Sequence, residues 1–269
     1  MGLSVGIVGL PNVGKSTLFN ALLKRQVANV AAYPFTTIEP NVGVVAVPDE
    51  RLERLRELIN PEKTVPAAVK FIDVAGLVKN AHQGEGLGNQ FLAKIREVDA
   101  VVHLIRAFED KSVSHYYASI DPQRDKEIVD LELKLAGIKK PVLYVLNTND
   151  EKAGGIEDEI LKICAKTGRG IEKLIHEAYQ LLNLITFYTI KGGRELTAWS
   201  LGKGQTASDA ASRVHTDMAK GFIKAEVVSF ENLMQAGSWL ASRNKGKIRL
   251  EGKSYVIQDG DVVEFKFNL

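Results

Sequence analysis

The sequence has only one cysteine, Cys164, among its 269 residues. A single cysteine excludes an internal disulfide and is typical of a reducing compartment. No apolar run reaches the roughly 18 residues that a membrane-spanning helix needs. The first residues also show neither the basic region nor the cleavage site of a secretory signal. From these absences we expect a cytoplasmic protein that has no membrane partner.

The sequence also has little net charge. Lysine and arginine number 35, and aspartate and glutamate 33, which gives a formal charge of +2. Such a small excess does not by itself indicate a nucleic-acid-binding protein, and we expect no DNA partner. Apolar residues make up 45% and charged residues 25% of the chain, which are ordinary globular values and exclude a disordered or fibrous chain.

Residues 1–185 alternate between buried-strand and helix patterns. Apolar strands that alternate with amphipathic helices are typical of a doubly wound α/β fold with a mostly parallel sheet. We therefore predict such a domain over residues 1–185. Strands are expected at 3–8, 42–47, 68–74, 100–105 and 141–146, and helices at 15–24, 89–97, 125–135 and 170–182.

Residues 186–269 show a different pattern, with short strands around one main helix at 210–220. Gly192 and Gly193 predict a hairpin turn, and the segment 206–209 resembles a capping box. We predict a small α+β domain of the ubiquitin-like β-grasp kind, with the domain boundary at about residue 185. Strands are expected at 187–190, 196–200, 222–228, 247–250 and 262–267.

A glycine-rich motif follows the first expected strand, since residues 9–16 fit G-x-x-x-x-G-K-[ST]. Glycines let the backbone curl so that its N–H groups face phosphate oxygens, and the next helix presents its positive N-terminal end to them. Lys15 is expected to reach the β- and γ-phosphates and to act in catalysis, while the Ser16 hydroxyl is expected to bind Mg²⁺. The expected phosphate-binding residues are Asn12, Val13, Gly14, Lys15, Ser16 and Thr17.

Two further segments supply expected Mg²⁺ ligands. Asp73 begins a D-x-x-G pattern at the end of an expected strand, where such an aspartate holds the metal of P-loop enzymes. Thr36 and Thr37 lie between this aspartate and the glycine-rich motif, where a switch loop places a threonine on Mg²⁺ and the γ-phosphate. One of the two threonines is expected to do so, and Thr37 is also our candidate for a catalytic role.

The segment 147–150, Asn-Thr-Asn-Asp, follows another buried strand, in the place of the base-reading loop N-K-x-D of GTPases. Asn147 and Asp150 are therefore expected to face the nucleotide base. A second base-contacting loop is expected at Cys164, Ala165 and Lys166, in the place usually held by S-A-K. In that position Cys164 is interpreted as a small packing residue rather than a reactive thiol.

These motifs together resemble the Obg branch of GTPase-like P-loop proteins, and within it the YchF, or Obg-like ATPase, subfamily. The resemblance extends over nearly the whole chain, because the C-terminal part is similar to the TGS domain that closes YchF proteins. The segments that carry the resemblance are 9–20, 33–38, 73–79, 84–92, 215–226 and 250–261.

The resemblance implies a P-loop domain, an inserted helical arm and a TGS domain. It also implies hydrolysis of ATP, often in preference to GTP, and association with ribosomes, where we expect the large subunit or structured RNA to be the partner. Mg²⁺ is the expected cofactor, and K⁺ is a candidate activator. Under this interpretation the protein is a slow nucleotide-dependent switch.

Two departures from the subfamily pattern leave alternatives open. The subfamily's base loop reads N-x-x-E, whereas this chain has Asp150 in place of the glutamate and Thr148 in place of the GTPase lysine. We favour ATP, with GTP as the alternative. The helical arm has no counterpart near residues 136–140. Either this chain is a compact form, or the arm is missing only from the sequence as given, and we favour the second explanation.

Hydrolysis needs a group that orients the attacking water. GTPases place a glutamine directly after D-x-x-G, but here that position holds Leu77, which cannot hold water. His82, in the glycine-rich stretch that follows, is our candidate catalytic residue because an imidazole can accept a proton near neutral pH. The other histidines, His103, His115, His176 and His215, are interpreted as structural.

A basic run near the C-terminus is the candidate partner surface. Its side chains are Arg243, Lys245, Lys247 and Arg249. Such a run is either a solvated surface or a phosphate-contacting patch for RNA. Two other functions therefore remain open: a strictly GTP-specific Obg-type GTPase, and a TGS-based RNA- or ribosome-binding module in which the nucleotide is only a structural ligand.

Overall fold

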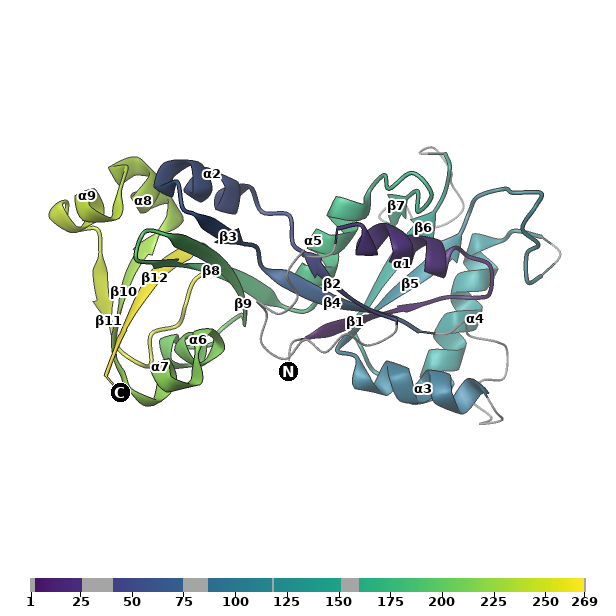
Figure 1. Ribbon diagram of the computed structural model, residues 1–269. Helices are drawn as coiled ribbons and strands as arrows, with labels where there is room; N and C mark the ends of the chain where they lie inside the picture. The colour runs from purple at the N-terminus through teal and green to yellow at the C-terminus, as the bar shows by residue number, and fades with distance from the viewer. Residues whose placement is uncertain (1–2, 26–40, 75–86, 118, 151–159, 269) are drawn as a thin grey trace. The chain divides into compact units, whose positions relative to one another are not determined.

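The computed structural model describes residues 3–25, 41–74, 87–117, 119–150 and 160–268 (Figure 1). Within these ranges the chain forms two compact units. The first contains residues 1–46 and 69–182, and the second contains residues 47–68 and 183–269. The helices in the described ranges are too short or too polar to span a membrane.

The first unit is built on a six-stranded sheet in the order β2-β4-β1-β5-β6-β7. Strands β4, β1, β5, β6 and β7 run parallel to one another, as predicted for a doubly wound α/β fold. Every residue of β1 and β5 is buried, which explains their nearly continuous apolar sequences. The strands are β1 (Ser4–Val8), β2 (Val42–Ala46), β4 (Ala68–Asp73), β5 (Ala100–Arg106), β6 (Val142–Asn147) and β7 (Leu161–Ile163).

In the described part of this unit the sheet is accompanied by α1 (Lys15–Leu23), α3 (Leu87–Glu97), α4 (Pro122–Leu135) and α5 (Ile171–Leu181). Helix α4 begins with Asp121, whose side chain accepts a hydrogen bond from the Arg124 N–H, and with Pro122 in the first turn. The helix ends at Leu135, Gly137 follows with φ 68°, and the Ile138 N–H donates to the Leu133 carbonyl oxygen. The chain therefore passes from α4 to β6 through a short closed turn, at the place where the resemblance implies a helical arm in the family.

The second unit contains a six-stranded sheet in the order β11-β10-β12-β8-β9-β3. Strands β8 and β9 form an antiparallel hairpin across Gly192 and Gly193, β12 pairs parallel with β8, and β10 pairs antiparallel with β12 and β11. These five strands give the β-grasp arrangement that was predicted. The strands are β3 (Lys63–Val65), β8 (Leu184–Lys191), β9 (Glu195–Gly202), β10 (Phe222–Ser229), β11 (Arg249–Glu251) and β12 (Asp261–Phe267).

The helices of the second unit differ from the single main helix predicted. The expected helix at 210–220 is two helices, α6 (Ala207–Val214) and α7 (Thr216–Lys220), because His215 adopts an extended conformation and caps α7. The predicted capping box is present, with Thr206 and Asp209 bonding reciprocally. Alanines of α6 pack in the core against Phe187, Val227 and other residues of the sheet. Two further helices, α8 (Phe230–Ala236) and α9 (Trp239–Asn244), were not predicted, although Ser229 and Ser238 cap them.

Residues 47–68 were predicted as part of the first domain but belong to the second unit. They contain the unpredicted helix α2 (Glu50–Ile59) and strand β3, which adds to the edge of the second sheet by pairing with β9. The Arg51 guanidinium also binds Asp259, and the Arg54 guanidinium lies over the Phe230 ring. These partners are distant in sequence, so local patterns could not indicate them.

Candidate functional site

Most of the expected site residues in the first unit lie at the carboxyl ends of the strands of its parallel sheet. The glycine-rich motif follows β1, Asp73 ends β4, and Asn147 ends β6. The strand registers place Ile7 beside Asp73, and Arg106 at the end of β5 beside Asn147. The carboxyl edge of a parallel sheet is where α/β proteins bind ligands, because the loops that leave the strands converge there.

The glycines of the motif are required by close backbone contacts. A Cβ atom on Gly9 would lie 2.4 Å from the Leu104 carbonyl oxygen, and one on Gly14 would lie 2.5 Å from Nδ2 of Asn147. Gly14 also has φ 96°, which side chains rarely tolerate. Gly14 is the N-cap residue of helix α1. Because glycine has no side chain, it supplies no hydrogen-bond acceptor to the N–H groups of the first turn.

Lys15 is a buried cation within the motif. Its ammonium group donates hydrogen bonds to the carbonyl oxygens of Gly9 (3.0 Å) and Leu10 (2.9 Å). Burial lowers the pKa of Lys15 to about 8, although the negative charge of Asp73 opposes this shift. A polyphosphate would favour the charged form of this lysine.

Ser16 and Asp73 are the described candidates for Mg²⁺ ligands. Ser16 is exposed in the first turn of α1, next to Lys15. Burial raises the pKa of Asp73, while the positive charges of Lys15 and Lys94 lower it. The pairing of Asp73 with Ile7 on the neighbouring strand places this residue near the start of the phosphate-binding loop. A hydroxyl and a carboxylate are oxygen ligands that suit Mg²⁺, so the residues present fit this ion.

Asn147 joins the glycine-rich motif to the second base loop. Its Nδ2 donates to the carbonyl oxygen of Val13 (3.0 Å), and its Oδ1 accepts a hydrogen bond from the Ala165 N–H (3.0 Å). Asn147, Val13 and Ala165 are all buried. Three segments far apart in sequence therefore meet at one amide side chain, and the structure brings these predicted residues together.

The loop after Asn147 has a closed conformation. The Thr148 hydroxyl donates to the Asp150 carbonyl oxygen (3.0 Å) and accepts from the Asp150 N–H (3.1 Å). Thr148 is buried, whereas Asp150 is exposed, as are Thr17 and Lys166. Arg169 also donates to the Thr148 carbonyl oxygen (3.3 Å). This loop thus fixes the backbone through Thr148 and presents the Asp150 side chain to solvent.

Cys164 is a free, buried cysteine of the second base loop. Its thiol donates to Oδ1 of Asn149 (3.7 Å). Burial opposes ionisation of this thiol, but hydrogen bonds from Thr167 and Lys166 outweigh it and lower the pKa of Cys164. The contact with Asn149 links the two base loops, as a packing residue would.

Several sequence-predicted residues lie outside the described ranges. They are Thr36, Thr37 and His82, together with Leu77, the position that the water-orienting glutamine holds in GTPases. Their predicted roles in metal binding and catalysis remain predictions.

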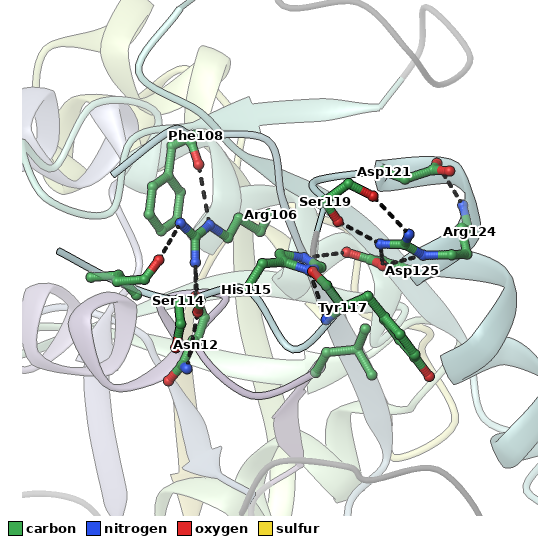
Figure 2. Close-up of polar contacts among 12 residues, drawn as sticks. Asn12, Arg106, Phe108, Ser114, His115, Tyr117, Ser119, Asp121, Arg124 and Asp125 are labelled. Atoms are coloured by element: carbon green, nitrogen blue, oxygen red, sulfur yellow. Dashed lines mark hydrogen bonds and ion pairs between the residues drawn. The ribbon is translucent and has the colours of Figure 1, made fainter. Parts of the chain in front are cut away.

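The sequence interpretation missed a polar network beside the motif (Figure 2). Arg106 is buried and donates hydrogen bonds to carbonyl oxygens of the motif and of residues 108–114. Further along, Nε2 of His115 lies 2.8 Å from Oδ2 of the buried Asp125, which also pairs with Arg124. The available signal was Arg106 itself, a charged residue at the carboxyl end of a strand that is apolar except for His103.

The four basic residues predicted to contact a partner belong to two groups. Arg243 pairs with Glu226, and Arg249 contacts the buried Asp261 and the Tyr255 hydroxyl. Lys245 and Lys247 are exposed. Within the described ranges neither lysine has an ion pair. The two arginines therefore have partners within the protein, whereas the two lysines are exposed and can contact a binding partner.

Comparison with known proteins identifies relatives of the whole chain. One family model, described as a 50S ribosome-binding GTPase, matches residues 4–148. Another, YchF-GTPase_C, described as a protein of unknown function (DUF933), matches residues 184–268. Together they span both units.

Individual relatives agree with these models. The "Ribosome-binding ATPase YchF" of Bacillus subtilis (strain 168) is 37% identical over 368 residues, with 100% of each chain covered. The protein of the same name from Mycoplasma genitalium (strain ATCC 33530 / DSM 19775 / NCTC 10195 / G37) is 38% identical, with 99% of this chain and 100% of that one covered. The solved structure of the Schizosaccharomyces pombe YchF GTPase has a TM-score of 0.82 and 29% identity, with 98% of each chain covered.

This chain is shorter than its alignment with the Bacillus subtilis relative. The comparison with the Bacillus subtilis protein extends over 368 residues, whereas this chain has 269. It therefore includes many positions at which this chain has no residue.

Proposed function

The chain belongs to the YchF family, and we propose that it binds ATP with Mg²⁺, hydrolyses it slowly and uses the nucleotide to control association with the ribosome. The observation that carries this proposal is that the glycine-rich motif, Asp73 and Asn147 all lie at the carboxyl ends of strands of one parallel sheet, where Asn147 bonds to the motif at Val13. The relatives named as ribosome-binding ATPases support the same activity and partner.

Each predicted site residue has a role in this proposal. The N–H groups and side chains of residues 12–17 hold the phosphates, and Lys15 neutralises charge that develops on them. Asn147, Asp150 and residues 164–166 surround the base. Ser16, Asp73 and one of Thr36 and Thr37 hold Mg²⁺, which when bound neutralises phosphate charge. His82 is the proposed water-orienting residue.

We place the protein in the cytoplasm, with K⁺ as a candidate activator and the large ribosomal subunit or structured RNA as the partner. The proposed nucleotide-binding domain comprises residues 1–46 and 69–182, and the proposed TGS domain comprises residues 183–269, to which residues 47–68 add helix α2 and strand β3. The closed turn after α4 and the length difference from the Bacillus subtilis relative support a compact form that has no helical arm.

GTP remains the alternative substrate because of one specific observation. Asp150 is exposed in the base-reading loop, and an aspartate in this position can accept hydrogen bonds from two N–H groups of guanine. Calorimetric titration of the full chain with non-hydrolysable ATP and GTP analogues, each with Mg²⁺, distinguishes the two. Binding of the ATP analogue at least about tenfold more tightly, or 1.4 kcal/mol, supports the ATPase. Tighter binding of the GTP analogue overturns this base assignment.

A second experiment separates a switch from a passive binding module. Lys15→Ala should abolish nucleotide binding, and ribosome co-sedimentation should then no longer respond to added nucleotide. A passive module would keep the same ribosome affinity with and without nucleotide in both proteins. Absence of any nucleotide binding by the unaltered chain would refute the proposed function outright.

A further inference from the structure

Arg106 is one of the largest fully buried side chains of the described chain, with 1% of its surface exposed. It ends strand β5, and the acceptors of its guanidinium group among the described residues are all backbone carbonyl oxygens. The acceptors are Phe108 (3.1 Å), Asn12 (3.2 Å), Ser114 (3.3 Å) and Val113 (3.0 Å). Figure 2 shows these bonds radiating from the guanidinium.

No carboxylate within the described ranges forms an ion pair with Arg106. Buried arginines usually have such a partner, because removing a charge from water is costly. Here the carbonyl dipoles and the Phe108 ring, whose centroid lies 4.4 Å from the guanidinium carbon, stabilise the charge instead. The group therefore serves to arrange backbone, since its planar fork can hold several carbonyls in fixed directions.

The carbonyls belong to two separate segments. Asn12 is part of the glycine-rich motif, whereas Val113 and Ser114 belong to the irregular segment after β5. Asn12 has φ 61°, and its Nδ2 donates to the Ser114 carbonyl oxygen (3.1 Å). Asn12 and Arg106 thus share one acceptor, and the guanidinium joins the motif to the neighbouring segment.

The bond to the Asn12 carbonyl has a consequence for the next residue. In a planar trans peptide the C=O of one residue and the N–H of the following residue point in opposite directions. When Arg106 holds the Asn12 carbonyl toward itself, the Val13 N–H is directed away from Arg106. In a phosphate-binding loop this N–H is one of the donors that must face the ligand.

We propose that Arg106 is a positioning residue of the nucleotide site, which aims the Val13 N–H at the phosphates by fixing the Asn12 peptide. This inference rests on the proposed function, because it concerns the same site. Arg106 touches no reacting atom in this scheme, and its effect passes entirely through the peptide that it orients.

Arg124 provides a matched control in the same network. It too is an arginine bound to backbone, donating to the Ser119 carbonyl oxygen (2.7 Å), and it pairs with Asp125 (2.9 Å). Its guanidinium lies over the Tyr117 ring, as that of Arg106 lies over Phe108. None of its described contacts reaches the glycine-rich motif.

The test compares Arg106→Lys with Arg124→Lys in the full chain. Each is titrated with a non-hydrolysable ATP analogue and Mg²⁺, and KM, kcat and the unfolding temperature are measured. Loop contacts made equally in the ground and transition states affect KM more than kcat. We therefore expect R106K to raise Kd and KM by about tenfold or more while kcat changes by less than about threefold. R124K should lower the unfolding temperature without changing Kd.

Two results would overturn the inference. One is an R106K protein that binds nucleotide as tightly as the unaltered chain. The other is an R106K protein that loses as much stability as R124K and whose Kd rises no more than that of R124K. This result would give Arg106 a merely structural role. If the unaltered chain binds no nucleotide, the proposed function itself has failed, which is a distinct outcome.

A second variant covers the case in which R106K does not fold. Asn12→Gly removes the neighbouring bond to Ser114 without leaving a buried cation unpaired, and glycine accepts the φ of 61° at this position without strain. Because Asn12 is joined to the network through the acceptor that it shares with Arg106, N12G alone should raise Kd, and its effect should be additive with that of R124K. Unchanged Kd in N12G, together with an unfolded R106K, would refute the positioning role. Where R106K folds, N12G and R106K should be non-additive.

Discussion

The hydroxyl of Tyr188 donates a hydrogen bond of 2.5 Å to Oδ2 of Asp49, across 139 residues of sequence. Tyr188 is fully buried in β8, and Asp49 caps helix α2. Burial and the neighbouring Asp49 carboxylate raise the pKa of Tyr188 well above its ordinary value, so the phenol remains a donor. This bond joins residues 47–68 to residues 183–269, the rest of the second unit. The same residues lie in sequence between the Thr36–Thr37 segment and Asp73.

Tyr188→Phe should destabilise the second unit. The substitution removes one buried hydrogen bond to a charged acceptor and leaves the rest of the ring in place, so we expect a loss of about 1.5–3 kcal/mol in unfolding free energy. Chemical denaturation followed by circular dichroism measures it. Lys63→Ala, which removes an exposed ion pair with Glu195, is the control and should cost less than about 1 kcal/mol. Equal losses in both variants would contradict the importance of this bond.

Asp150→Ala tests which base the site reads. If the carboxylate accepts N–H groups of guanine, its removal should weaken GTP binding by about tenfold and leave ATP binding nearly unchanged. Asn149→Ala is the matched control, because Asn149 is the exposed neighbour of Asp150 and its side chain accepts a hydrogen bond from the Cys164 thiol. Calorimetry with both nucleotide analogues provides the readout. Equal weakening of both nucleotides would show that Asp150 does not discriminate between bases.

Nucleotide affinity should fall as the pH rises above 8. Burial lowers the pKa of Lys15 to about 8, so the free site loses a proton above this pH. Bound phosphates favour the ammonium form of Lys15 and raise its pKa. Above pH 8, nucleotide binding must therefore be accompanied by uptake of a proton by Lys15, whereas well below pH 8 Lys15 is already charged and no proton is taken up. Affinity should fall by at most about tenfold per pH unit.

Calorimetry checks this proton uptake directly. Titrations at about pH 9 in two buffers of different ionisation enthalpy should give different apparent binding enthalpies, because a proton is taken up. Lys15→Arg keeps its charge at that pH and should remove the difference. Identical enthalpies in both buffers for the unaltered chain would mean that Lys15 is already fully charged in the free site.

Asp73→Asn should raise the Mg²⁺ concentration needed for tight nucleotide binding by about tenfold or more, because a carboxylate ligand is lost. The fold should tolerate the change, since burial already raises the pKa of Asp73 and an amide carries no charge to desolvate. The control is Asp99→Asn. Asp99 accepts a hydrogen bond from the Ser4 N–H (2.8 Å) at the opposite edge of the sheet. Equal Mg²⁺ dependence in the two variants would exclude Asp73 as a ligand.

Lys245→Glu combined with Lys247→Glu should weaken ribosome co-sedimentation, most strongly at low salt where charges are least screened. Arg243→Gln should act differently. It leaves the nearly buried Glu226 without its closest cation, so it should mainly lower stability, by about 1–3 kcal/mol. Unaltered co-sedimentation of the lysine variant would assign the partner surface elsewhere.

The sequence by itself determined the alternation of strands and helices, the glycine-rich motif and the β-grasp strands. These features follow from local rules: apolar periodicity, the conformational freedom of Gly14, and the capping chemistry of Thr206 and Asp209. Each can be recognised within a few residues of chain. For that reason the expected strands lie within a few residues of those in the structure.

Only the tertiary structure decided which segments meet. It placed residues 47–68 in the second unit through Tyr188, β9 and Asp259. It joined Val13 to Ala165 through Asn147, and Asn12 to Ser114 through Arg106. A long-range hydrogen bond leaves no periodic signal in a sequence, because its two partners need only be complementary after the chain has folded.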